Sequence, residues 1–147
     1  MNVQDYIRYS ARITPDRDFF MVEIDGKGWE GALSQGRTIE EAKEMAEALI
    51  FDYVEGLIEF KRRIPEPTVI EKDRYIVNIG YDAALKIMLR NIMYDKQVKQ
   101  AELARLINVT PQALNAIINL RKNTNLNRLG ECFKALGVKL NIEVRDE

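Results

Sequence analysis

The sequence predicts an α+β fold in two parts: a β-β-β-α-β module over residues 1–80 and an all-α domain over residues 81–147. Apolar residues alternate near the N-terminus and recur at helical spacing further on. Residues 1–80 hold 11 Lys/Arg and 16 Asp/Glu, whereas residues 81–147 hold 11 and 7, so the net charges are −5 and +4. This asymmetry favours two modules with different partners, and uneven surface charge on one domain is the alternative.

The composition excludes several classes of protein. The chain of 147 residues is 46% apolar and 31% charged, which suits a soluble fold with a core. It has no run of roughly 20 apolar residues and no secretion signal, so we expect no membrane partner and a bacterial-type cytoplasm. One cysteine, Cys132, and no histidine are present. These counts exclude a disulfide framework, a Cys/His zinc site and a Cys–His or Ser–His catalytic pair.

The first strands are expected in a hairpin. Residues 6–14 alternate between apolar and polar side chains, which is typical of a half-buried strand. Residues 15–18 predict a turn, and Phe19–Ile24 predicts a second, antiparallel strand. A loop over residues 25–28 precedes a short third strand, expected over residues 29–35.

A long helix is expected after Thr38, because Thr38 and Glu41 have the spacing of a capping box. Its polar face is acidic. Pro65 and Pro67 enforce a break, and residues 75–79 predict another strand. The apolar positions expected to face the sheet are Ala42, Met45, Ala46, Leu49, Tyr53 and Leu57.

Four carboxylates near the hairpin are the candidates for chemistry in this half, since paired carboxylates bind metals or act as acid and base. Asp16 and Asp18 also fit an ordinary turn, and Glu23 and Asp25 flank a glycine-rich loop without a third ligand. We therefore expect no catalytic residue, no metal and no cofactor. Cys132 is expected in the core of a later helix.

The second half predicts four helices. Asp82 is expected to cap a helix over residues 83–95, and residues 100–107 predict a short helix that ends at Asn108. Thr110 caps the next helix, with Pro111 in its first turn. Asn125 caps the fourth, which Gly137 ends. The apolar positions assigned inward are Ala84, Leu85, Met88, Ile92, Leu103, Ala104, Ile107, Leu114, Ile117, Ile118, Leu126, Leu129, Cys132, Phe133 and Leu136.

Two short helices joined by a tight turn, with small Ala104 at their crossing, predict a helix-turn-helix. Its second helix must present polar residues to the DNA major groove, and Gln and Asn match the edge of adenine. Gln100 begins the first helix, where phosphate can bind. Residues 86–139 hold ten basic and three acidic residues, which favours DNA over an ordinary helical bundle. The predicted DNA-binding residues are Gln100, Thr110, Gln112, Asn115, Asn119, Arg121 and Lys122.

These motifs resemble two families. The run Q-x-x-L-A-R-L-x-N-V-T-x-Q-x-L-x-x-I from Gln100 resembles Cro/repressor helix-turn-helix domains. The hairpin, the S-Q-G-x-T-x-E-E-A run from Ser34 and the I-P-E-P run from Ile64 resemble the HicB antitoxin module. The joining A-L-K-x-x-L-x-N-x-M run from Ala84 is similar to the HicB subclass with a helix-turn-helix.

The resemblance implies a partial ribonuclease-H-like fold in an antitoxin of a type II toxin–antitoxin system. Such a protein binds a HicA-type toxin, a small ribonuclease, and represses its operon on double-stranded operator DNA as a homodimer or tetramer. The sequence departs from the family's Pro-Asp-x-Pro-Gly turn at residues 24–31, and Lys99 stands where Ser or Thr usually caps. No ribonuclease H acidic site is recognisable, so we expect the fold without the activity. The toxin-binding residues are not identified.

Two other functions stay open. One is a stand-alone transcriptional repressor whose first module senses a ligand or oligomerises, and the other is an RNA-processing enzyme that uses the Asp/Glu cluster. Residues 139–144 alternate between polar and apolar side chains, which predicts either a C-terminal strand or a frayed tail.

Overall fold

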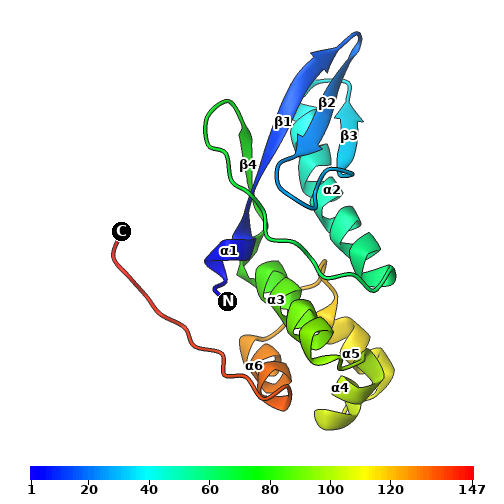
Figure 1. The fold of residues 1–147 in the computed structure, drawn as a ribbon, viewed down its shortest axis with the longest axis vertical. Coiled ribbons are helices and arrows are strands. Elements are labelled where there is room, and N and C mark those ends of the chain that lie inside the picture. The colour runs from blue at the N-terminus through cyan, green and yellow to red at the C-terminus, as the bar shows by residue number, and fades with distance from the viewer.

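The computed structural model describes residues 1–147 and divides them into a sheet-containing half and a helical half (Figure 1). This arrangement confirms the predicted α+β fold. None of the helices combines the length and the apolar composition that a membrane span requires. In chain order the elements are α1 (Gln4–Ile7), β1 (Arg8–Asp16), β2 (Phe19–Ile24), β3 (Leu33–Gly36), α2 (Ile39–Glu59), β4 (Tyr75–Asn78), α3 (Gly80–Lys96), α4 (Gln100–Leu106), α5 (Pro111–Ile118) and α6 (Leu126–Ala135).

The four strands form one antiparallel sheet in the order β3-β2-β1-β4, with α2 packed against it (Figure 1). The predicted hairpin is confirmed, but its turn is shorter than expected. Pro15 pairs with Phe20 and Asp16 with Phe19, so only residues 17 and 18 connect the strands. Arg17 takes a left-handed φ of 58° to allow this tight reversal.

Two strand boundaries differ from the prediction. Tyr6 belongs to α1, where it is buried, and β1 begins only at Arg8. The third strand begins at Leu33 because residues 26–32 form tight turns around Trp29. The Trp29 ring is fully buried, with its centroid 5.2 Å from those of Tyr9 and Tyr53. Burial of this large ring outweighs the local preference for an extended strand.

Helix α2 begins as predicted, because the Thr38 hydroxyl accepts a hydrogen bond from the Glu41 N–H at 3.0 Å. A side chain at Gly36 would place its Cβ 2.5 Å from the Ala42 nitrogen, so the end of β3 approaches the helix as only glycine permits. The fully buried stripe differs from the expected one. It comprises Ala42, Ala46, Ile50 and Val54, whereas Met45, Leu49, Tyr53 and Leu57 are half-buried at its edges.

Helix α3 lies between the two halves, and every residue from Ala83 to Leu89 is buried. The predicted inward positions Ala84, Leu85 and Met88 are buried, and the opposite side is buried as well because α3 has neighbours on both sides. Asp82 does not cap the helix, which starts earlier, at Gly80. Instead, the Asn78 side chain accepts from the Gly80 N–H at 2.8 Å. One continuous core therefore runs through both halves.

Asn91 of α3 is a buried polar anchor toward the first half. Its Oδ1 accepts from the Ile64 N–H, and its Nδ2 donates to the Ile64 carbonyl, both at 2.8 Å. The same Nδ2 lies 3.3 Å from the Tyr6 hydroxyl. Asn91 is only 1% exposed and Ile64 is fully buried, so water does not reach the Ile64 N–H and carbonyl. The Asn91 side chain supplies the hydrogen bonds that these backbone groups need.

The remaining helix ends agree with the sequence. Asn108 has a left-handed φ of 58°, and Gly137 one of 77°. Asn125 caps α6 by accepting from the Asn127 N–H at 2.8 Å. Leu126 was assigned inward but is 46% exposed, because it is the first residue of α6. Residues 139–144 pair with no strand in this single chain, and they extend away from α6 (Figure 1).

Candidate nucleic-acid interface

Helices α4 and α5 pack together as the predicted helix-turn-helix pair. Leu103 and Ala104 of α4, and Leu114 and Ile118 of α5, are buried. The Thr110 hydroxyl caps α5 by accepting from the Ala113 N–H at 3.1 Å. With its apolar side fixed in this way, α5 exposes the opposite side to solvent, as DNA recognition requires.

Gln112 and Asn115 are exposed on α5, as the sequence predicts for base-reading residues. Asn115 is held by Gln100, whose Nε2 donates to the Asn115 Oδ1. The Oε1 of Gln100 in turn accepts from Arg90 of α3 at 3.3 Å. Because the Asn115 carbonyl is engaged, its amide N–H₂ group is the part available to a base edge.

Arg90 was not predicted from the sequence as part of this site, because its contact with Gln100 becomes visible only in the fold. It is mostly buried, and this burial lowers the pKa of its guanidinium. The chain of contacts from Arg90 through Gln100 to Asn115 links three helices. Gln100 was predicted to bind phosphate, and the structure shows it supporting a side chain of α5.

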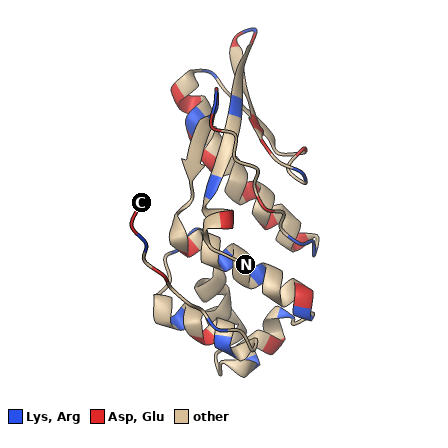
Figure 2. Cartoon of the chain, turned by 60° about the vertical axis from the view of Figure 1, so that its left-hand side comes forward, with Lys and Arg blue, Asp and Glu red and all other residues tan.

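The basic residues of the helical half are not all available to a ligand. Figure 2 marks several acidic positions along α2, and it marks basic positions together with a few acidic ones over the helical half. Lys86 is fully buried, Arg121 pairs with α2, and Arg128 pairs with Glu131 at 2.8 Å. The exposed cations without an ion-pair partner in this half are Lys96, Lys99, Arg105, Lys122, Lys134 and Lys139.

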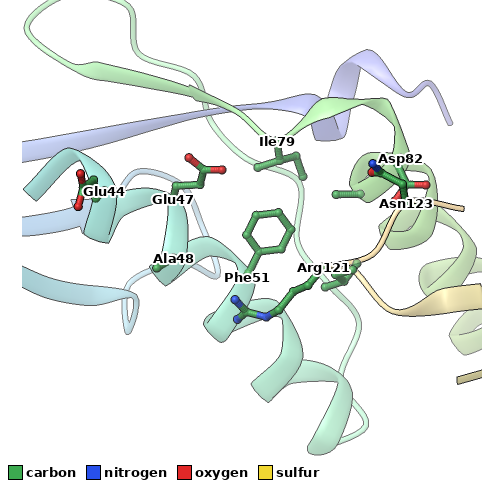
Figure 3. Close-up of a pocket in the computed structure, with 10 residues that line it drawn as sticks. Glu44, Glu47, Ala48, Phe51, Ile79, Asp82, Arg121 and Asn123 are labelled. Atoms are coloured by element: carbon green, nitrogen blue, oxygen red, sulfur yellow. The ribbon is translucent and has the colours of Figure 1, made fainter. Parts of the chain in front are cut away.

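Arg121 points away from α5 and toward α2 (Figure 3). Its Nη2 donates to Asp52 at 2.6 Å and to Glu55 at 2.7 Å. Its guanidinium carbon lies 5.6 Å from the centroid of the Phe51 ring. The hydrogen bond to Glu55, together with Asp52, raises the pKa of Arg121. The structure therefore does not group Arg121 with Gln112 and Asn115.

An open groove lies where Arg121 meets α2, between the two halves (Figure 3). Its volume is about 490 Å³. Glu44, Glu47 and Phe51 line it from α2, and Ile79 contributes from the start of α3. This mixture of charged and apolar groups does not identify a particular ligand.

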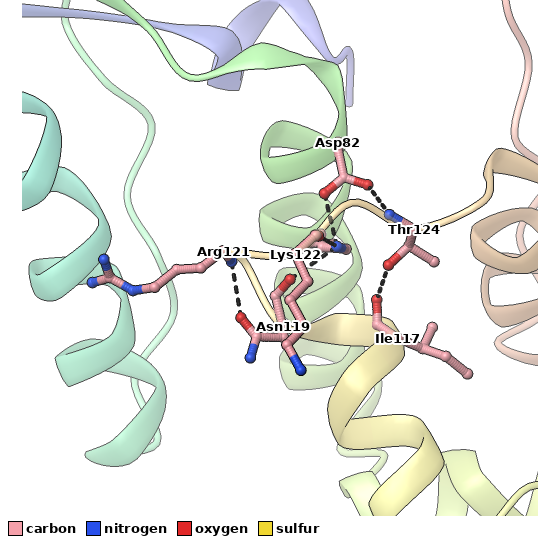
Figure 4. Close-up of polar contacts among 7 residues, drawn as sticks. Asp82, Ile117, Asn119, Arg121, Lys122 and Thr124 are labelled. Carbon is pink, nitrogen blue, oxygen red and sulfur yellow. Dashed lines mark hydrogen bonds and ion pairs between the residues drawn. The ribbon is translucent and has the colours of Figure 1, made fainter.

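Side chains of α3 hold the loop after α5 through hydrogen bonds (Figure 4). Asn119 is half-buried, and its side chain accepts from the Arg121 N–H at 2.9 Å. The Asn119 carbonyl accepts from Lys86 at 2.9 Å. Asn119 thus shapes the turn, whereas the Lys122 side chain is exposed and carries no hydrogen bond within the chain.

The four carboxylates near the hairpin are not brought together. Asp16 lies beside the hairpin turn, whereas Asp25 follows the other end of β2. The Asp25 Oδ2 accepts from Ser10 Oγ at 2.7 Å and from Arg74 Nε at 2.8 Å, so it holds the segment before β4. The structure contains no group of three His, Cys, Asp or Glu side chains arranged for a metal ion.

Comparison with known proteins matches both halves. Residues 8–88 match the family model described as "HicB_like antitoxin of bacterial toxin-antitoxin system", and residues 90–142 match one described as "Helix-turn-helix". The chain is 32% identical to "Antitoxin HicB 2" of Photorhabdus laumondii over 127 residues, covering 82% of this chain and 90% of that protein. It is 29% identical to "Antitoxin HicB" of Escherichia coli over 138 residues, covering 92% and 98%.

Proposed function

Because the chain belongs to the HicB-like antitoxin family and ends in a helix-turn-helix DNA-binding domain, we propose that it blocks a HicA-type RNA-cleaving toxin and represses its own operon. The observation that carries this proposal is the pairing of an antitoxin module with an exposed recognition helix in one chain. Gln112 and Asn115 are exposed on that helix, where the Gln112 side chain and the Asn115 amide N–H₂ group can meet a base edge. Both expected partners belong to the bacterial cytoplasm, where we expect this chain.

For repression, two copies of the chain place their α5 helices in successive major grooves. The spacing that this requires is about 34 Å, one turn of the duplex, and the operator is then an inverted repeat. Gln112 and Asn115 read bases, and Lys122 binds phosphate. Thr110 lies at the N-terminus of α5, where backbone N–H groups favour an anion.

For toxin neutralisation, the first half acts by binding rather than by chemistry. It covers the RNA-binding surface of the toxin so that RNA cannot enter. An RNA-cleaving partner is expected to be basic, and the acidic outer side of α2 is complementary to such a surface. This side carries Glu40, Glu44, Glu47, Asp52, Glu55 and Glu59, all exposed; Glu44 and Glu47 also line the groove, and Asp52 and Glu55 also hold Arg121.

A second candidate function rests on the groove between the halves. A stand-alone repressor that senses a small ligand needs a site that communicates with α5, and the groove joins α2 to the loop after α5. In that case the first half responds to a ligand and binds no toxin.

Co-expression distinguishes the two functions. The full chain is produced with the small open reading frame adjacent to its gene, and growth, co-purification and transcription from the upstream DNA are measured. We expect the chain to restore growth and to purify with the neighbour's product. The double variant Gln112→Ala/Asn115→Ala should still restore growth but lose repression. Repression without binding of any neighbour product would support the ligand-sensing alternative.

A further inference from the structure

We propose that Lys86 is a positioning residue for DNA recognition, although it lies on α3 and outside the helix-turn-helix pair. It holds the C-terminal end of α5 and the loop that follows at a fixed place. This inference rests on the proposed reading of DNA by α5. Lys86 itself has no access to DNA, because its side chain is 0% exposed.

All the donor capacity of the Lys86 ammonium is used inside the protein. Nζ lies 2.7 Å from Asp82 Oδ2 and 2.9 Å from the Asn119 carbonyl oxygen, and it also donates to the Lys122 carbonyl. An ammonium has three donors, so these three acceptors satisfy it. Asp82, one turn earlier on α3, compensates the buried charge.

Asp82 extends the same network to the far end of the loop. Its second oxygen, Oδ1, accepts from the Thr124 N–H at 2.9 Å. The Thr124 hydroxyl then donates to the Ile117 carbonyl, in the last turn of α5, at 2.7 Å. The loop is consequently tied to α3 at residues 119, 122 and 124, and tied back to α5 by Thr124.

The network fixes α5 from one end. A cation is favourable beside the free carbonyls at a helix C-terminus, and Lys86 supplies it there from a neighbouring helix. Gln112 and Asn115 lie on the same eight-residue helix, so a shift at its end moves them too. A binding site loses affinity when the residues around it no longer fix the positions of the side chains that contact the ligand. Loss of Lys86 therefore acts on base reading without removing a phosphate contact.

The test compares full-length Lys86→Met, which keeps the side-chain length but lacks the ammonium, with Ile87→Val, a buried change on the same helix. Each protein is first shown to be folded by circular dichroism. Binding is measured on the duplex upstream of the chain's gene and on random DNA of equal length, over a range of salt concentrations. Hydrogen exchange of the Thr124 and Ala113 amides is followed by NMR.

We expect Lys86→Met to weaken binding to the upstream duplex by about tenfold relative to Ile87→Val. The slope of log affinity against log salt should stay unchanged, whereas Lys122→Ala should lower that slope by about one. The Thr124 amide should exchange faster in Lys86→Met, while the Ala113 amide keeps its protection. These results together would support a positioning role.

Four results would overturn the inference. The first is that folded Lys86→Met prefers the upstream duplex over random DNA as strongly as wild type does. The second is that the salt slope of Lys86→Met falls by about one, which would make Lys86 a direct phosphate contact. The third is an equal loss of affinity for the upstream duplex in Ile87→Val.

If Lys86→Met does not fold, Thr124→Val decides. This variant removes only the hydrogen bond to Ile117, and it should weaken the preference for the upstream duplex. If wild type does not prefer the upstream duplex, the proposed repression fails. The fourth result, unchanged exchange of the Thr124 amide in Lys86→Met, overturns the inference by itself and does not depend on DNA binding.

Discussion

Arg121 and Glu55 join the DNA-binding half of the chain to the acidic helix of the other half. The Nη2 and Nε atoms of Arg121 lie 2.7 and 3.1 Å from Glu55 Oε1, across 66 residues of sequence. A guanidinium held by carboxylates is not available to a phosphate. Under the proposed function, the acidic side of α2 would compete with DNA for this cation.

Release of Arg121 should increase DNA affinity. In the double variant Asp52→Asn/Glu55→Gln the guanidinium is free, and the salt slope of DNA binding should become steeper by about one. The free energy of unfolding should change by at most about 1 kcal/mol, because the side chains of Arg121, Asp52 and Glu55 are exposed and solvent screens their charges. Filter binding over a salt series measures the slope, and Glu59→Gln on the same helix is the control. An unchanged slope would remove Arg121 from the residues that bind DNA.

Gln112→Ala and Asn115→Ala should each reduce operator binding by about 1–3 kcal/mol, because the first removes a donor and acceptor pair from a base edge and the second removes the Asn115 amide donor. Binding to random DNA should change little, since phosphate contacts are retained. Fluorescence anisotropy with both duplexes measures the difference, and Asn127→Ala on α6 is the control. Equal losses on both duplexes would contradict base reading.

Asn91→Ala should destabilise the whole chain by about 2–4 kcal/mol. The substitution leaves the Ile64 N–H and carbonyl buried without their partners, and each such group carries its own desolvation cost. Urea unfolding followed by the fluorescence of the single tryptophan, Trp29, reports the loss, with the exposed Asn141→Ala as control. A midpoint equal to that of the control would show that water replaces the lost bonds.

The Arg63–Asp95 pair should give stability a small dependence on acid pH. The hydrogen bond from Arg63 lowers the pKa of Asp95 below its ordinary value of 3.8. A carboxyl whose pKa is lower in the folded state stabilises the fold above its unfolded pKa, and the gain disappears as pH falls through the folded pKa. Because both side chains are over 40% exposed, the gain is at most about 1 kcal/mol.

Urea midpoints of wild type and Asp95→Asn at pH 7 and pH 3 test this dependence. Wild type should be the more stable at pH 7, and the difference should shrink at pH 3. A difference that persists at pH 3 would show that Asp95 stabilises the chain by packing rather than by charge.

Sequence patterns predicted the elements that local chemistry determines. Thr38, Thr110 and Asn125 cap helices as their spacing indicates, and Asn108 takes the left-handed conformation expected at a helix end. These features depend on backbone groups within a few residues, so the sequence contains them directly.

Features that depend on distant partners were not predictable in this way. The basic count over residues 86–139 treats Lys86 and Arg121 as surface cations, but one is buried against Asp82 and the other is held by α2. A linear count contains no information on which carboxylate folds back onto which cation. The position of Trp29 was likewise not predictable from its neighbours in sequence, which favour a strand. Its ring is buried against Tyr53, which lies on a helix that comes later in the chain.

The two polar anchors on α3 cross the junction between the two matched families. Lys86 lies within the antitoxin match but holds the loop after α5, and Asn91 lies within the helix-turn-helix match but holds Ile64. A hybrid protein joined at residue 89 would therefore take each anchor from one parent and its partners from the other. Genetic exchange of DNA-binding domains within this family should succeed chiefly between parents that share both sets of partners.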